Sequence, residues 1–154
     1  MFQNRSIVVS AILLLACGAS NAENQKKPLS PLDVVNARMA AHNDHDLEKF
    51  LSVYSPDIQV YDYPGKPIGE KGKPHIRKIF EPLFADGAVR VEIHQQIAKG
   101  NYVVNEETVV RRGTTYEYVS IYEIEKGLIK TVRFIRGPKP SSAAAPPRLE
   151  RVTK

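Results

Sequence analysis

The fold is decided by the stretch Tyr54-Ser55-Pro56-Asp57-Ile58-Gln59-Val60-Tyr61-Asp62-Tyr63-Pro64-Gly65. It ends one predicted helix, turns, and continues as a short strand from Ile58 to Tyr63 that stops at a Pro-Gly pair. Strand side chains alternate between two faces, so Ile58, Val60 and Asp62 should share one face. A carboxylate at the end of an apolar face loses hydration, which should raise its pKa and make Asp62 a candidate general base. The alternative is that Asp62 caps the strand and contacts solvent.

Two helices are predicted before this strand and one after it. Ser30-Pro31-Leu32-Asp33 combines a capping side chain with a proline suited to the first turn, so a helix should begin there. A second helix is expected from Leu47, because apolar side chains follow at helical spacing up to Tyr54. After the Gly/Pro-rich segment 64–73, Pro74 should open a third helix, which Pro82 should weaken near its end.

From Val89 onward the apolar residues alternate with polar ones, which predicts strands. Turns at 99–101, 111–113 and 125–127 separate four such segments, and turns this short predict an antiparallel meander. The predicted fold class is therefore α+β, with a curved antiparallel sheet wrapped on three N-terminal helices. Such a sheet leaves a cone with one open mouth, and the domain should cover residues 31–137.

The two ends of the chain of 154 residues are predicted to lie outside this domain. Residues 1–22 have the features of a signal peptide, with Arg5 before an apolar stretch and a peptidase site at Ser20-Asn21-Ala22. We therefore expect an exported protein, either periplasmic or secreted. The alternative is an outer-membrane lipoprotein with a lipid anchor at Cys17, which ends a lipobox-like stretch. Residues 23–30 should form a flexible lead, and residues 138–154 a disordered basic tail rich in Pro and Ala.

Composition argues against several classes of function. The formal net charge is +5, but the basic residues are scattered, so no nucleic-acid partner is expected. The apolar stretch near the N-terminus is too short for a permanent membrane span. Cys17 is the only cysteine, so the mature domain should contain no disulfide. The histidines show no metal-ligand spacing and the glycines form no phosphate loop, so neither a metal nor a cofactor is expected.

Four segments carry a family resemblance. They are Asn43-Asp44-His45-Asp46-Leu47, the stretch from Tyr54 to Gly65, Gly100-Asn101-Tyr102-Val103-Val104, and Ile121-Tyr122-Glu123-Ile124 with Lys126-Gly127-Leu128-Ile129. With them the chain resembles, from about Leu32 to Ile135, the SnoaL-like branch of the nuclear transport factor 2-like (NTF2-like) superfamily. The resemblance implies a cystatin-like cone. The resemblance implies the function only weakly, because one fold hosts many functions. The superfamily includes ketosteroid isomerases, cyclases, dehydratases and non-catalytic binding or association domains.

The resemblance to ketosteroid isomerase also implies site residues. The base position falls on Asp62, which could move a proton next to a carbonyl group. Ketosteroid isomerase also uses two oxyanion donors, a Tyr and a protonated Asp. Their positions fall on Arg38 and near Ser120 in this chain, and both differences count against the usual steroid mechanism. An inward-facing Arg38 would stabilise an oxyanion or bind a ligand carboxylate. On its helix, however, we expect Arg38 at the outer surface.

A second acid and the ligand-binding residues come from the later strands. Glu106 shares a strand face with Tyr102, while Glu107 lies on the other face, and alternation does not decide which face is interior. Either acid would form a pair with Asp62 that suits acid–base work. The residues expected to bind a ligand are Val60, Tyr102, Tyr118 and Ser120, although aromatic strand residues also serve as plain packing.

Two functions remain open at this point. The first is an exported domain whose apolar pocket binds a small hydrophobic molecule, with cofactor-independent isomerase or cyclase chemistry in which Asp62 is the base. The alternative is a non-catalytic binding module in the cell envelope that forms a homodimer through its sheet.

Overall fold

The computed structural model describes residues 28–138 and 141–142. The helices are α1 (Pro31–Asn43), α2 (Leu47–Ser52) and α3 (Lys73–Ala85). The strands are β1 (Tyr54–Asp62), β2 (Lys66–Pro67), β3 (Val89–Lys99), β4 (Tyr102–Arg111), β5 (Thr114–Glu125), β6 (Leu128–Arg136) and β7 (Ser141–Ser142). None of the helices in these ranges has the length and apolar character needed to cross a membrane. The predicted signal peptide, residues 23–27 of the lead and most of the predicted tail lie outside the described residues.

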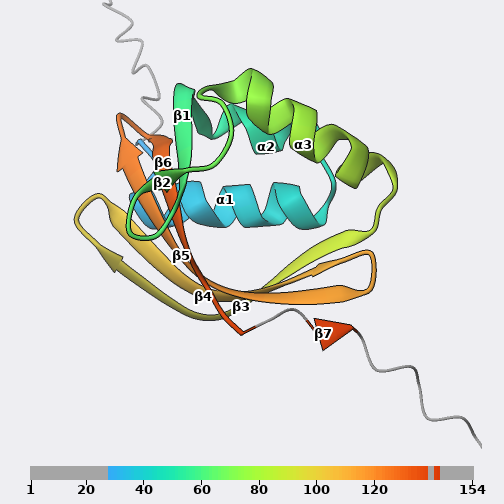
Figure 1. Cartoon of the computed structure of the whole chain (residues 1–154). Coiled ribbons are helices and arrows are strands. Elements are labelled where there is room, and N and C mark those ends of the chain that lie inside the picture. Colours follow the sequence, from blue (N-terminus) through green and yellow to red (C-terminus); the bar gives the residue numbers. More distant parts are fainter. Residues whose placement is uncertain (1–27, 139–140, 143–154) are drawn as a thin grey trace, which may run out of the picture.

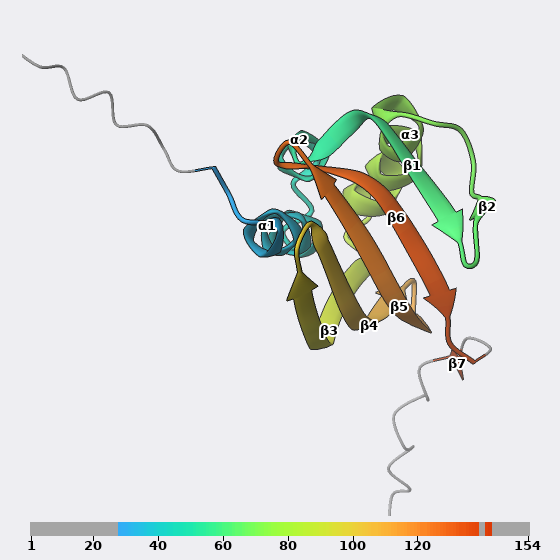
Figure 2. The ribbon, with the colours of Figure 1, turned by 90° about the vertical axis from the view of Figure 1, so that its left-hand side faces the viewer.

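The helices lie against the concave side of one curved sheet (Figure 1). Helix α1 contacts β3, β4 and β6 on one side and α2 on the other. The strand order is β2-β1-β6-β5-β4-β3, with β7 paired to β5, and Figure 2 shows this order across the sheet. Strands β3 to β6 form the predicted antiparallel meander, whereas β1 pairs with β6 in parallel. The predicted α+β cone is confirmed, and the parallel pair is a feature that side-chain alternation could not predict.

Two boundaries differ from the sequence prediction, the junction of α2 with β1 and the start of the tail. Helix α2 ends at Ser52 and β1 begins at Tyr54. Tyr54, which the helical spacing of apolar residues had assigned to this helix, still packs in the aromatic core from the start of the strand. Its ring lies 5.2 Å from that of Phe50. Helix α3 continues past Pro82 to Ala85, so this proline lies near its end, as predicted. Ser141–Ser142, in the segment predicted to be a disordered tail, pairs with Thr114 and Thr115 of β5.

The turn between β4 and β5 fixes the pairing register of these two strands. Arg112 and Gly113 both have positive φ angles, of 50° and 76°, as a two-residue hairpin turn of type I′ requires. Arg111 therefore lies opposite Thr114, and the register then places Glu107 opposite Tyr118. Glu107 and Tyr118 therefore share a sheet face, and the burial of Glu107 shows that this face is the interior of the cone.

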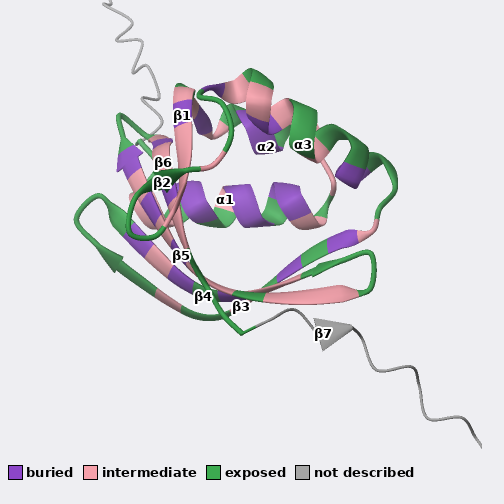
Figure 3. Cartoon of the chain, in the orientation of Figure 1, coloured by how far each residue is buried: buried purple, intermediate pink, exposed green. Residues whose placement is uncertain are grey.

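Aromatic side chains form much of the core between the helices and β1. Phe50 is fully buried, and its ring centroid lies 4.5 to 5.2 Å from those of Tyr54, Phe80 and Phe84. Figure 3 shows that α1 is buried along most of its length, while the outer face of α3 is exposed. The cluster packs α2 and α3 together and leaves a hollow between α3, α1 and the sheet.

The start of α1 carries a complete capping box. The Asp33 amide donates to Ser30 Oγ at 3.2 Å, and the Ser30 amide donates to Asp33 Oδ2 at 3.1 Å. Ser30→Ala should therefore lower the free energy of unfolding by about 1 kcal/mol, measured by urea denaturation. Ser30→Asn, which keeps a good capping group, should retain most of the stability. An equal loss in both variants would show that capping is not the cause.

Candidate functional site

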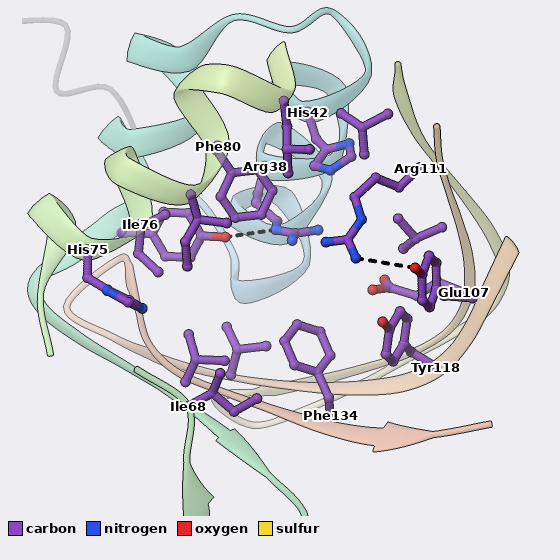
Figure 4. A pocket seen from close by; sticks show the side chains of 18 of the residues that line it. Arg38, His42, Ile68, His75, Ile76, Phe80, Glu107, Arg111, Tyr118 and Phe134 are labelled. Carbon is purple, nitrogen blue, oxygen red and sulfur yellow. Dashed lines mark hydrogen bonds between the residues drawn. The ribbon is translucent and has the colours of Figure 1, made fainter. Parts of the chain in front are cut away.

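A cavity of about 300 Å³ lies between α1, α3 and the concave face of the sheet (Figure 4). Its volume is at the small end of the range of about 300–1,000 Å³ that is usual for ligand sites. Helix α3 and strands β1, β4 and β6 supply most of the walls. The apolar lining residues are Val60, Ile68, Ile76, Ile79, Phe80, Leu83, Val89, Val109, Val132 and Phe134.

Glu107 is a buried carboxylate in this lining, with only 2% of its surface exposed. Its Oε1 accepts a hydrogen bond from Ser120 Oγ at 2.7 Å, and its Oε2 accepts from Asn105 Nδ2 at 3.3 Å and from Tyr122 at 3.3 Å. The neighbour Glu106 is exposed. The question that alternation left open is thus answered: Glu107 faces the interior and Glu106 faces outward, so the placement of Glu106 in the site is wrong.

Arg38 also lies inside the cone, so the prediction of an outer-surface position is wrong. The reason is that α1 is covered on two sides, and Arg38 keeps only 5% of its surface exposed. Its Nε donates to the Tyr54 hydroxyl at 2.9 Å, and its guanidinium carbon lies 5.4 Å from the centroid of the Tyr122 ring. Burial by itself would lower the pKa of Arg38, but Tyr122, Tyr54 and Glu107 outweigh it and raise this pKa. Arg38 therefore keeps its positive charge.

His42 lies one helical turn after Arg38 and lines the same cavity. It is 2% exposed, and its Nδ1 is a buried polar atom without a hydrogen-bond partner among the described residues. Burial, together with the nearby charge of Arg38, lowers the pKa of His42 to about 3. The ring is therefore neutral at pH 7 and can exchange a hydrogen bond with a ligand.

Two further arginines reach the cavity from its exposed edge. Arg111 donates from Nη2 to the Tyr116 hydroxyl at 3.3 Å, and its guanidinium carbon lies 5.0 Å from the centroid of that ring. Arg136 donates from Nε to Asp62 Oδ1 at 2.7 Å. Both arginines line the cavity, and in Figure 4 the guanidinium of Arg111 points into it. The edge of the cavity is therefore polar and positively charged.

Asp62 lies at this edge and not in apolar surroundings. Its side chain is 33% exposed, it forms the ion pair with Arg136, and it is absent from the cavity lining. The physical reason is that β1 ends at Asp62, next to the exposed end of β6. The sequence-based alternative, a carboxylate at the strand end in contact with solvent, describes this position.

The expected ligand-binding residues are divided between the cavity and the surface. Val60 and Tyr118 line the cavity, and Ser120 adjoins it through its bond to Glu107. Tyr102 lies outside, because it starts β4 on the outer face, is 42% exposed and donates to Glu123 at 3.2 Å. Within residues 28–138 and 141–142, no three His, Cys, Asp or Glu side chains are grouped so that they could hold a metal ion.

Sequence reasoning gave no site role to two polar lining residues, His42 and Arg111. His42 follows the apolar spacing of α1 and so gives the signal of a core residue. Arg111 stands beside a turn, where a charged side chain is ordinarily solvated. The β4–β5 pairing register, which can be counted back from the two-residue turn, is the signal that could have placed Glu107 on the same sheet face as Tyr118.

The curved sheet, the covering helices and the cavity between them define the class of NTF2-like domains. The model of the SnoaL-like domain family matches residues 35–132, and the chain belongs to this family. No curated protein matches the chain.

Solved structures of the same fold are similar over most of the domain. An uncharacterized cystatin fold protein from Novosphingobium aromaticivorans is 28% identical, with a TM-score of 0.63 over 70% of this chain and 99% of that one. An NTF2-like protein of unknown function from Cytophaga hutchinsonii is 18% identical, with a TM-score of 0.63 over 73% and 95%. A putative ketosteroid isomerase from Kribbella flavida is 16% identical, with a TM-score of 0.56 over 79% and 85%.

Proposed function

We propose that this domain binds a small, mainly apolar molecule in its cavity. The observation that carries the proposal is the hollow itself, whose apolar walls include a few convergent polar groups: Arg38, His42 and Glu107. Such a mixture is typical of sites where apolar contacts supply affinity and polar groups fix the orientation of the ligand. With the signal peptide expected in residues 1–22, we place this binding outside the cytoplasm, in the periplasm or the medium.

A matched pair of valines on β4 tests the proposal. Val109 lines the cavity, whereas its neighbour Val110 is exposed. The probe is N-phenyl-1-naphthylamine, a neutral molecule whose fluorescence rises in apolar surroundings. Val109→Phe should fill part of the cavity and raise the dissociation constant at least tenfold, while Val110→Phe should leave it unchanged. Failure of the wild-type protein to bind the probe, or equal binding by both variants, would contradict the proposal.

Proton transfer by Asp62 is a second candidate function. Asp62 is held by Arg136, which lines the cavity, and it shares a strand face with Val60. Because Asp62 lies at the edge of the cavity, this step requires a ligand that extends from Arg38 to that edge, with its α-carbon beside Asp62. Asp62 would take the C–H proton, the electron pair would form an enolate stabilised by Arg38, and the proton would then return to carbon.

The test of this second function is hydrogen–deuterium exchange at the α-carbons of 2-tetralone in D₂O, followed by NMR. The wild-type protein should accelerate exchange over buffer, and Asp62→Asn should reduce that acceleration at least tenfold. Asp57→Asn is the control, because Asp57 lies on the same strand and forms ion pairs with Lys71 and Lys130 away from the cavity lining. Equal exchange in all three proteins would exclude Asp62 from this chemistry.

A further inference from the structure

The charged side chains that line the cavity are unbalanced. Arg38, Arg111 and Arg136 face a single lining carboxylate, Glu107. Arg136 is already paired with Asp62. Within the part of the chain that the structure describes, neither Arg38 nor Arg111 has a carboxylate within 4.0 Å. Two guanidinium groups that line the cavity, the buried one of Arg38 and the exposed one of Arg111 at its edge, are therefore left without an ion-pair partner.

Glu107 supplies one negative charge, but its oxygens accept their hydrogen bonds from side chains other than the arginines. These donors are Ser120, Asn105 and Tyr122. Arg38, by contrast, uses its Nε on Tyr54 and its Nη1 on the sulfur of Met39. An arginine has five N–H donors, so Arg38 retains donors that have no acceptor among the described residues.

Both guanidinium groups are directed into the cavity. Arg38 comes from α1 and Arg111 from the end of β4, and in Figure 4 both point into the cavity. A planar guanidinium matches a carboxylate with two parallel hydrogen bonds, which are stronger than those between neutral groups. The apolar walls around them, including Ile76 and Phe80, suit the remainder of such a ligand.

We infer that the ligand of this cavity is a small apolar molecule that carries a carboxylate group, bound by Arg38 and Arg111. This inference rests on the proposed binding function and specifies the chemical class of the ligand. His42, which is neutral, adds a hydrogen-bonding group beside the carboxylate without adding charge. The buried Glu107 would repel the carboxylate and so directs it to the arginines.

The experiment compares 2-naphthoate with 2-naphthamide, which has nearly the same shape but no charge. Because the chain contains no Trp, the fluorescence of the naphthalene ring can be followed without a tryptophan background. The wild-type protein should bind the naphthoate at least tenfold more tightly than the amide. Arg111→Gln should remove most of this preference, whereas Arg112→Gln should preserve it, because Arg112 pairs with Asp86 and is absent from the cavity lining.

The outcomes separate the two proposals. Equal binding of the acid and the amide would overturn the carboxylate inference, and so would an equal loss of the preference for the acid in the two arginine variants. If N-phenyl-1-naphthylamine still binds in these cases, the proposal that the cavity binds apolar molecules stands. Absence of binding by all three probes would overturn both. The exposed position of Arg111 at the end of β4 makes misfolding of its variant unexpected, and thermal unfolding of both variants checks this.

Discussion

Replacing Glu107 with Ala is expected to lower the free energy of unfolding by about 3 kcal/mol. The change leaves Ser120 and Asn105, both fully buried, without their acceptor. It also removes the negative charge that helps to hold Arg38 protonated inside the cone. Urea denaturation at pH 7 measures the loss. Glu107→Gln keeps the shape and one acceptor oxygen, so it should cost less than the alanine variant.

Glu106 provides the matched control for this prediction. It is the preceding residue on β4, it is exposed, and it differs from Glu107 only in the direction of its side chain. Glu106→Ala should therefore stay close to the wild-type stability. Equal losses at the two positions would mean that the inward position of Glu107 has no energetic consequence.

The second large effect is a dependence of stability on pH that comes from His42. Burial and the charge of Arg38 lower its pKa from 6.5 to about 3. Between these values the unfolded chain binds a proton that the folded protein does not bind, so stability must fall as the pH falls below 6.5. From pH 7 to pH 4.5 this single group should remove about 2.5 kcal/mol.

His42→Leu isolates this contribution. Leucine fits the aromatic surroundings of the ring, which include Phe50, Phe80 and Phe84, and it does not titrate. The variant should lose less stability than the wild-type protein over the same pH range, measured by urea denaturation at several pH values. His94→Gln, at an exposed position on β3, should keep the wild-type slope. Parallel slopes for all three proteins would show that His42 does not couple folding to pH.

The sequence predicts the fold well because each element carries a local signal. The capping residues at Ser30, the apolar spacing of α2 and the short turns between strands all act over a few residues. The parallel pairing of β1 with β6 has no such signal. It depends on the curvature of the whole sheet, and so it could not be read from alternation.

The site was less predictable, because it is formed by residues whose direction depends on tertiary packing. Arg38 was expected at the surface, since an arginine on an amphipathic helix ordinarily faces water. Helix α1, however, is covered both by the sheet and by α2, so the Arg38 side chain is buried. For Asp62 the sequence left two positions open, among apolar side chains or at the solvent-exposed end of the strand, and the partner that holds it there, Arg136, comes from the distant end of β6. Long-range neighbours therefore decide where the charges of this domain lie.

The parallel pair also has a consequence for the order in which the chain folds. The hairpins β3–β4, β4–β5 and β5–β6 join neighbouring segments, so they can form early. Strand β1 joins this meander only through β6, which lies at the far end of the domain sequence. Closing the long loop between these two strands has an entropic cost, so we expect this pair to form late. Since Val60 and Val132 on these two strands face the hollow, we expect binding competence to appear only in the final kinetic phase of refolding.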